Sequence, residues 1–170
     1  MNSSALLVET FDRLPELVHA AVDGLSPEQL RWSPASGTNP IGWLVWHLTR
    51  VQDDHLAEVI GEPQVWAGDS WARRFGRTAD PADTGYGHSA EQVAAVAPES
   101  AAALVDYYTA VADRTRRFLV GLTDADLDRI VDQRWDPPVT LGARLVSVAN
   151  DSLQHVGQAG WLRGLLSATS

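Results

Sequence analysis

Apolar residues recur every three or four positions through most of this chain, and this helical period restricts the fold more than any other feature. The recurrence fills four stretches of roughly 20 residues each, at residues 6–24, 39–61, 98–121 and 141–166. Such spacing places the apolar side chains of each stretch on one face of a helix, and that face must be buried against another element. No stretch alternates apolar and polar residues as a half-buried strand does. We therefore predict an all-α fold, a four-helix bundle formed by a single domain over residues 1–170.

Capping and helix-breaking residues separate these stretches. In the second, Asn39 is the expected N-cap, Pro40 takes the first helical position and Gly61 ends the helix. In the first, Pro15 predicts either a kink or a late start. Shorter capped segments are expected at Ser26-Pro27-Glu28-Gln29, at Ser89-Ala90-Glu91-Gln92 and from Thr123 to Asp128.

The connection between the second and third long helices runs from Glu62 to His88 and is rich in Gly, Asp and Pro. We expect one turn of helix in it, near Trp71. A loop of this length in a compact domain is usually functional or covers another part of the molecule.

Composition excludes several functions. The net charge is −9, which opposes phosphate binding and disfavours a nucleic-acid partner. No apolar run approaches the ~18 residues that span a membrane, and the N-terminus lacks a signal-peptide pattern, so we expect a cytoplasmic protein without a membrane partner. The chain has no cysteine, so a bound metal must use nitrogen and oxygen ligands and any thiol must come from a cosubstrate.

Two groups of potential metal ligands lie about a hundred residues apart in the sequence. His47 belongs to the second long helix, whereas Asp151 and His155 belong to the fourth. Because they are four residues apart, Asp151 and His155 share one helix face, and that face carries the apolar stripe. Two nitrogens and a carboxylate can bind a divalent metal and leave coordination positions open. The alternatives are a buried Asp–His hydrogen bond with a structural role, or a stripe that opens locally to solvent.

The second helix offers two histidines. His55 points near the centre of its apolar stripe, whereas His47 lies at the edge, beside Asp54 and Glu58. Eight residues separate the histidines, roughly 12 Å along a helix, so they cannot bind one ion together. Periodicity by itself favours His55 as the inward residue. His88, in the long connection, carries a weaker signal.

Two motifs suggest a family. Trp46-His47-Leu48-Thr49-Arg50, together with Asp151-x3-His155-Val156-Gly157-Gln158, resembles the DinB/YfiT-like metalloenzyme superfamily over nearly the whole chain. Members bind one divalent metal through a histidine on the second helix and a His-x3-His pair on the last. The resemblance thus implies His47 and His155 as ligands, with Asp151 in place of the first histidine of the pair.

The carboxylate at this position is similar to the mycothiol-dependent isomerase branch, where Glu is used. An anionic ligand weakens the preference for imidazole-loving metals and lowers the Lewis acidity of the ion. Zinc, nickel, manganese and iron are not distinguished by this ligand set, and a degenerate site remains an alternative.

The resemblance implies a thiol S-transferase or a related hydrolase that uses a low-molecular-weight thiol and a small-molecule substrate. The metal would lower the pKa of a bound thiol or water. We assign no catalytic residue. Gln158 is a candidate to orient a ligand or substrate. Asp54 and Glu58 are candidates to support the metal ligands or to act in acid–base chemistry. Trp43 is a candidate wall of the pocket. The alternatives are a polar residue at a helix seam for Gln158 and ordinary solvated charges for the two carboxylates.

Two other classes of function remain open. One is a non-catalytic small-molecule-binding or stress-response module with a vestigial metal site. The other is a purely structural interaction protein in which Asp151 and His155 only bond each other. Related bundles often pair, so the resemblance also leaves open a homodimer.

Overall fold

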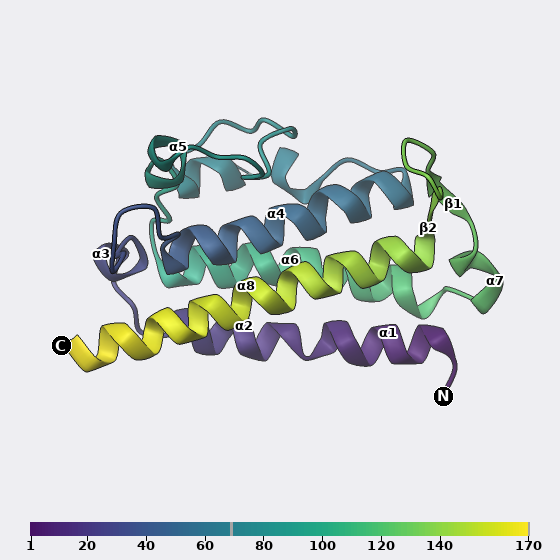
Figure 1. The fold of residues 1–170 in the computed structure, drawn as a ribbon, viewed down its shortest axis with the longest axis horizontal. Helices are drawn as coiled ribbons and strands as arrows, with labels where there is room; N and C mark the ends of the chain where they lie inside the picture. Colours follow the sequence, from purple (N-terminus) through teal and green to yellow (C-terminus); the bar gives the residue numbers. More distant parts are fainter. Residues whose placement is uncertain (69, 170) are drawn as a thin grey trace.

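We describe residues 1–68 and 70–169 of a computed structural model (Figure 1). The fold is mostly helical, in agreement with the all-α prediction. The longer helices are α1 (Ser3–Asp12), α2 (Leu14–Val22), α4 (Ile41–Ile60), α6 (Ala101–Val120) and α8 (Leu141–Thr169). Shorter ones are α3 (Pro27–Leu30), α5 (Ala90–Ala94), α7 (Asp124–Leu127) and the 3-10 turns η1 (Val65–Ala67) and η2 (Trp71–Phe75).

The long helices pack along a common direction. Helix α4 lies against α8 and α6, and the α1–α2 pair lies against the same two helices from the opposite side (Figure 1). Helices α4 and α8 run in opposite directions. The apolar stripe expected on α8 is buried between these helices, at Leu141, Leu145, Val148, Val156, Ala159, Leu162 and Leu166.

The helix ends follow the capping residues closely. Pro40 is the N-cap of α4 rather than its first residue, and Gly61 ends that helix in the left-handed conformation, at φ 78°. The capped segments expected at Ser26, Ser89 and Thr123 all form, each with a capping box. The first stretch is interrupted at Arg13, and its proline lies in the first turn of α2, where a missing backbone N–H does no harm.

A small hairpin was not anticipated from the sequence. Strand β1 (Ile130–Asp132) pairs with β2 (Val139–Thr140) in antiparallel fashion, with Ile130 opposite Thr140. Strands of three and two residues are too short to show an alternating pattern, which explains why periodicity missed them. The hairpin leads directly into α8 and sets where that helix begins.

Helix α4 is buried on more of its surface than one apolar stripe accounts for. Trp46, Arg50 and Asp53 are 0%, 0% and 1% exposed, although none belongs to the expected stripe. The connection from residue 62 to residue 88 covers this second face. Arg50 holds it there, because its guanidinium donates to the carbonyls of Pro81 and Asp83 at 3.0 Å each. The long connection therefore covers α4, as a loop of its length suggested.

Among the described residues, the helices are either too short or too polar to traverse a lipid bilayer.

Candidate metal centre

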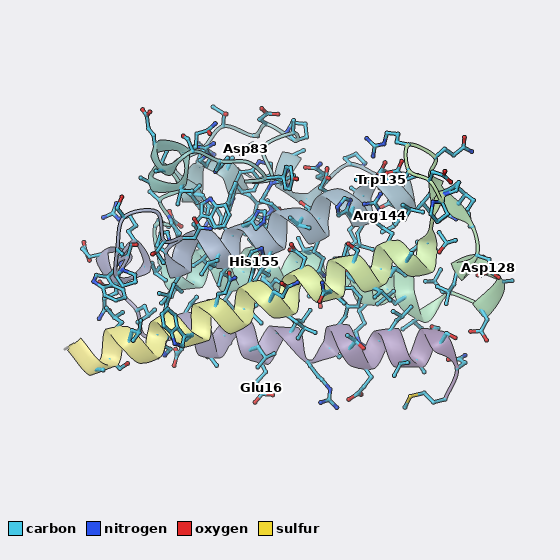
Figure 2. The ribbon with its side chains drawn as sticks, viewed as in Figure 1. Glu16, Asp83, Asp128, Trp135, Arg144 and His155 are labelled. Carbon is cyan, nitrogen blue, oxygen red and sulfur yellow. The ribbon has the colours of Figure 1, made fainter. Side chains whose placement is uncertain are left out.

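The structure brings together the three side chains that the motifs singled out. One candidate ligand atom each from His47, Asp151 and His155 lies within 4.8 Å of the other two. The antiparallel pairing of α4 and α8 causes this, because it places residue 47 opposite residues 151 and 155. The ring centroids of the two histidines are 4.8 Å apart. Figure 2 shows His155 near the middle of α8, on the side toward α4.

His47 is held in one orientation. Its Nδ1 lies 2.6 Å from the carbonyl oxygen of Thr84, so Nδ1 carries the hydrogen and donates it. Trp43 stacks on the imidazole, with ring centroids 4.5 Å apart and an interplanar angle of 15°. These two contacts leave Nε2 as the ring nitrogen available to a ligand, which is the usual arrangement of a metal-binding histidine.

His155 is oriented in a similar way by its own helix. Its Nδ1 donates to Oε1 of Gln158 at 2.9 Å, and a role for that glutamine in orienting a ligand stays a prediction. Its Nε2 lies 3.5 Å from Oδ1 of Asp151. The second carboxylate oxygen, Oδ2 of Asp151, is buried and has no hydrogen-bond partner. A buried carboxylate oxygen without a partner is uncommon and calls for an unseen donor or cation.

These features fit a divalent metal. The group supplies two imidazole nitrogens, both with their Nδ1 atoms already engaged, and a carboxylate with a free oxygen. Nitrogen and oxygen donors in this ratio suit zinc, nickel, manganese and iron, and three protein ligands leave positions for water or substrate.

The electrostatics of the two histidines differ. Burial lowers the pKa of His47, and the nearby His155 lowers it further, while the Thr84 carbonyl acts in the opposite direction. The hydrogen bond with Asp151 raises the pKa of His155 against the effect of burial. His47 is therefore neutral at neutral pH, whereas His155 holds its proton to a higher pH than an ordinary histidine.

The periodicity argument for His55 is wrong about which histidine faces the ligand group. His55 is only partly buried, and its Nδ1 lies 3.9 Å from Oδ2 of Asp54 and from Oε2 of Glu58. His47 is 6% exposed because the long connection creates a second buried face on α4. The preference for His47 came from the family motif.

The remaining candidates lie at different distances from the group. Trp43 stacks on His47, and its role as a wall of the pocket stays a prediction. Asp54 accepts a hydrogen bond from Gln64 at 2.7 Å, and burial raises its pKa. Glu58 is exposed on the outer side of α4, and an acid–base role for it stays a prediction.

The sequence analysis missed two supporting contacts of the site. The Thr84 contact uses a backbone carbonyl, which every residue has, so it cannot be predicted from residue types. His88, which carried only a weak signal, accepts from Nε1 of Trp43 at 3.2 Å and contacts Asp83 at 2.8 Å through Nε2. It thus supports the tryptophan that stacks on His47.

A cavity of about 640 Å³ begins at this group and extends along the seam between α4 and α8. His47, Thr84 and Asp151 line one end. Asp54, His55 and residues of the β1–β2 turn line the rest. Its volume is in the range of sites for small molecules, ~300–1,000 Å³.

Comparison with known proteins agrees with this architecture. A structure described as a conserved protein of locus from Enterococcus faecalis is 27% identical, with a TM-score of 0.89 and 99% of each chain covered. No curated protein matches the chain. The family model described as the DinB superfamily matches residues 10–159, which include all three candidate ligands. The match spans most of the sequence, and the chain therefore belongs to the DinB superfamily.

Proposed function

We propose that this protein is a metal-dependent enzyme in which His47, Asp151 and His155 hold one divalent ion. The observation that carries the proposal is the convergence of these three side chains, of which His47 and Asp151 line the end of a cavity of about 640 Å³. The unpartnered Oδ2 of Asp151 and the engaged Nδ1 atoms of both histidines support it. The bound ion would act as a Lewis acid that lowers the pKa of a thiol or water. We take α1 and α2 together as one interrupted helix of a four-helix bundle.

We further propose that the reaction is the transfer of a low-molecular-weight thiol or a related hydrolysis. The chain has no cysteine, so a sulfur nucleophile must enter from solution. The cavity is large enough for a small thiol and a second small molecule. The protein's own part is to fix the ligands through Thr84, Trp43 and Gln158.

One observation favours a second candidate function. Asp151 and His155 already form an ion pair, with Nε2 and Oδ1 3.5 Å apart, and such a pair can exist without a metal. In that case the cavity would belong to a non-catalytic small-molecule-binding module with a vestigial site.

Elemental analysis of the untagged protein separates the two candidates. We expect about one equivalent of metal per chain in the wild type and in His55→Ala, and none in the Asp151→Ala, His155→Ala double variant. Circular dichroism should show the same helix content in all three proteins. Metal retained in the double variant but lost from His55→Ala would contradict the ligand assignment.

If no metal binds after reconstitution with zinc, nickel and manganese, the binding module becomes the better account. If metal binds, the loaded protein should consume a low-molecular-weight thiol in the presence of an electrophile, as measured by loss of free thiol. The double variant is the matched control for that assay.

A further inference from the structure

The cavity beside the candidate metal centre has a second polar end. Arg144 precedes Asp151 by seven residues on α8, which corresponds to about two turns or ~10 Å along the helix. His55 follows His47 by a similar interval on α4. Because the two helices run in opposite directions, Arg144 comes close to His55, and its charge lowers the pKa of His55 after the larger effect of burial. Figure 2 shows Arg144 and Trp135 together at the hairpin end of the molecule, away from His155.

Charges of both signs gather at this second end, and its two arginines cluster on one carboxylate, Asp132. Arg134 and Arg144 both donate to Oδ2 of Asp132, at 2.8 and 2.9 Å. Two guanidinium groups thus share one carboxylate. Asp54 also lines the cavity, and its Oδ1 accepts from Gln64. Its Oδ2 and Oε2 of Glu58 each lie 3.9 Å from Nδ1 of His55.

Two buried polar atoms at this end have no hydrogen-bond partner. They are Nε of Arg144, in a side chain that is 12% exposed, and Nδ1 of His55. Both residues line the cavity, and so does Asp151, whose Oδ2 lacks a partner at the opposite end. A buried charged donor without a partner, such as Nε of Arg144, is costly unless a ligand completes it.

We propose that Arg144, assisted by His55 and Arg134, forms a subsite for a carboxylate carried by the substrate or by the thiol cosubstrate. The reactive end of the same complex lies at His47, Asp151 and His155. Between the two ends the wall includes Val51, one turn from each histidine on α4, so a short apolar linker fits there. The inference rests on the proposed function for the identity of the reactive end, whereas the carboxylate subsite can be tested without metal.

The first experiment uses cobalt-loaded protein and two probes of equal length, 6-mercaptohexanoate and 6-mercaptohexanol. The cobalt–thiolate absorption band reports binding of each thiol. We expect the acid to bind about ten to a hundred times more tightly than the alcohol, the range for a hydrogen bond to a charged group. Arg144→Gln should remove this preference and leave the alcohol unchanged, and Arg144→Lys should restore part of it.

The control variant is Arg116→Gln. It also removes one positive charge, but Arg116 pairs with Asp12 on the surface formed by α1 and α6, which is no part of the cavity. It should keep the full preference for the acid. An equal loss in Arg116→Gln and Arg144→Gln would reduce the effect to net charge and overturn the proposal.

The second experiment places the carboxylate on a separate molecule. Hexanoate is titrated into metal-free protein while the Arg144 Nε–H signal, identified by its absence in Arg144→Gln, is followed by NMR. A saturable shift supports the subsite even if no metal binds, in which case only the proposed function fails. Metal and thiol binding with no response to either carboxylate probe would overturn the subsite and leave the function in place.

The same probes identify which molecule carries the carboxylate. If hexanoate binds beside cobalt-bound 2-mercaptoethanol and 6-mercaptohexanoate gains nothing over its alcohol, the carboxylate belongs to the second substrate. If the linked acid shows the larger gain, it belongs to the thiol. Either result supports the subsite.

Discussion

At the scale of single residues, the orientation of His47 depends on a loop glycine. Gly85 has φ +89°, and a Cβ placed there would lie 2.8 Å from Nδ1 of His47. Gly85→Ala should therefore push the Thr84 carbonyl away from the imidazole. We expect metal affinity to fall roughly 10–100-fold, as for other contacts that orient a ligand, and unfolding free energy to fall by about 1–3 kcal/mol. Metal titration with a competing chelator and urea denaturation measure the two effects.

The matched control is Gly87→Ala. Gly87 has a similar φ of +73°, but a Cβ there meets nothing within 4 Å. The Gly87→Ala variant should lose only about 1–2 kcal/mol of unfolding free energy, from backbone strain, and keep normal metal affinity. Wild-type affinity in Gly85→Ala would mean that the Thr84 contact does not position His47.

The pH dependence expected for metal binding also follows from individual side chains. The hydrogen bond with Asp151 raises the pKa of His155, and a protonated imidazole cannot bind a metal. Metal affinity should therefore be full above the raised pKa of His155 and be lost as the pH falls through that pKa. Binding should begin to weaken at a pH slightly above the pKa range of ordinary histidines. Calorimetry in buffers of different ionisation enthalpy should detect proton release on binding near neutral pH. Asp151→Asn should move that release to lower pH, and no change would contradict the assignment.

At the scale of elements, one buried arginine of α4 makes several of the contacts that attach the long connection to that helix. Besides the carbonyls of Pro81 and Asp83, Arg50 donates to Gln64 at 2.8 Å and to the Tyr107 hydroxyl at 3.2 Å, and it pairs with Asp53 at 3.4 Å. Removing one partner of a buried ion pair leaves the other uncompensated. Arg50→Ala should therefore lower the unfolding free energy by about 3–5 kcal/mol.

The same variant should loosen the connection before the rest of the molecule unfolds. Amide hydrogen exchange from residue 77 to residue 88 should become faster than exchange in α6. Arg116→Ala, which removes a surface pair, should lower the unfolding free energy by less than about 1 kcal/mol and leave that exchange unchanged. Equal behaviour of the two variants would show that Arg50 does not anchor the connection.

At the scale of the whole molecule, the candidate ligands join two helices that are about a hundred residues apart in sequence. A ligand that binds only the folded protein adds about 2.7 kcal/mol of stability at a concentration 100 times its Kd. For a chain of this size each kcal/mol raises Tm by roughly 2–4 °C, so saturating metal should raise Tm by about 5–11 °C. Thermal unfolding with metal and with chelator measures the difference. His155→Ala should show no shift, and an equal shift there would point to another binding site.

Much of the fold could be predicted from local signals. The α8 stripe, the capping boxes and the stop at Gly61 all depend on residues near one another in sequence. The hairpin could not be predicted, because its strands are too short to carry a period. The second buried face of α4 was missed for a different reason: it exists only because residues 62–88 fold back over it.

The amino-acid sequence by itself determined the helices, their buried stripes and the family motif that names His47, Asp151 and His155. These depend on backbone periodicity and capping, which act over a few residues. The tertiary structure decided which histidine of α4 faces α8, that the Thr84 carbonyl orients it, and that Arg144 and Asp151 share one cavity. Such features arise from packing between distant segments. Residue types alone reveal neither a contact with a backbone carbonyl nor a donor without a partner.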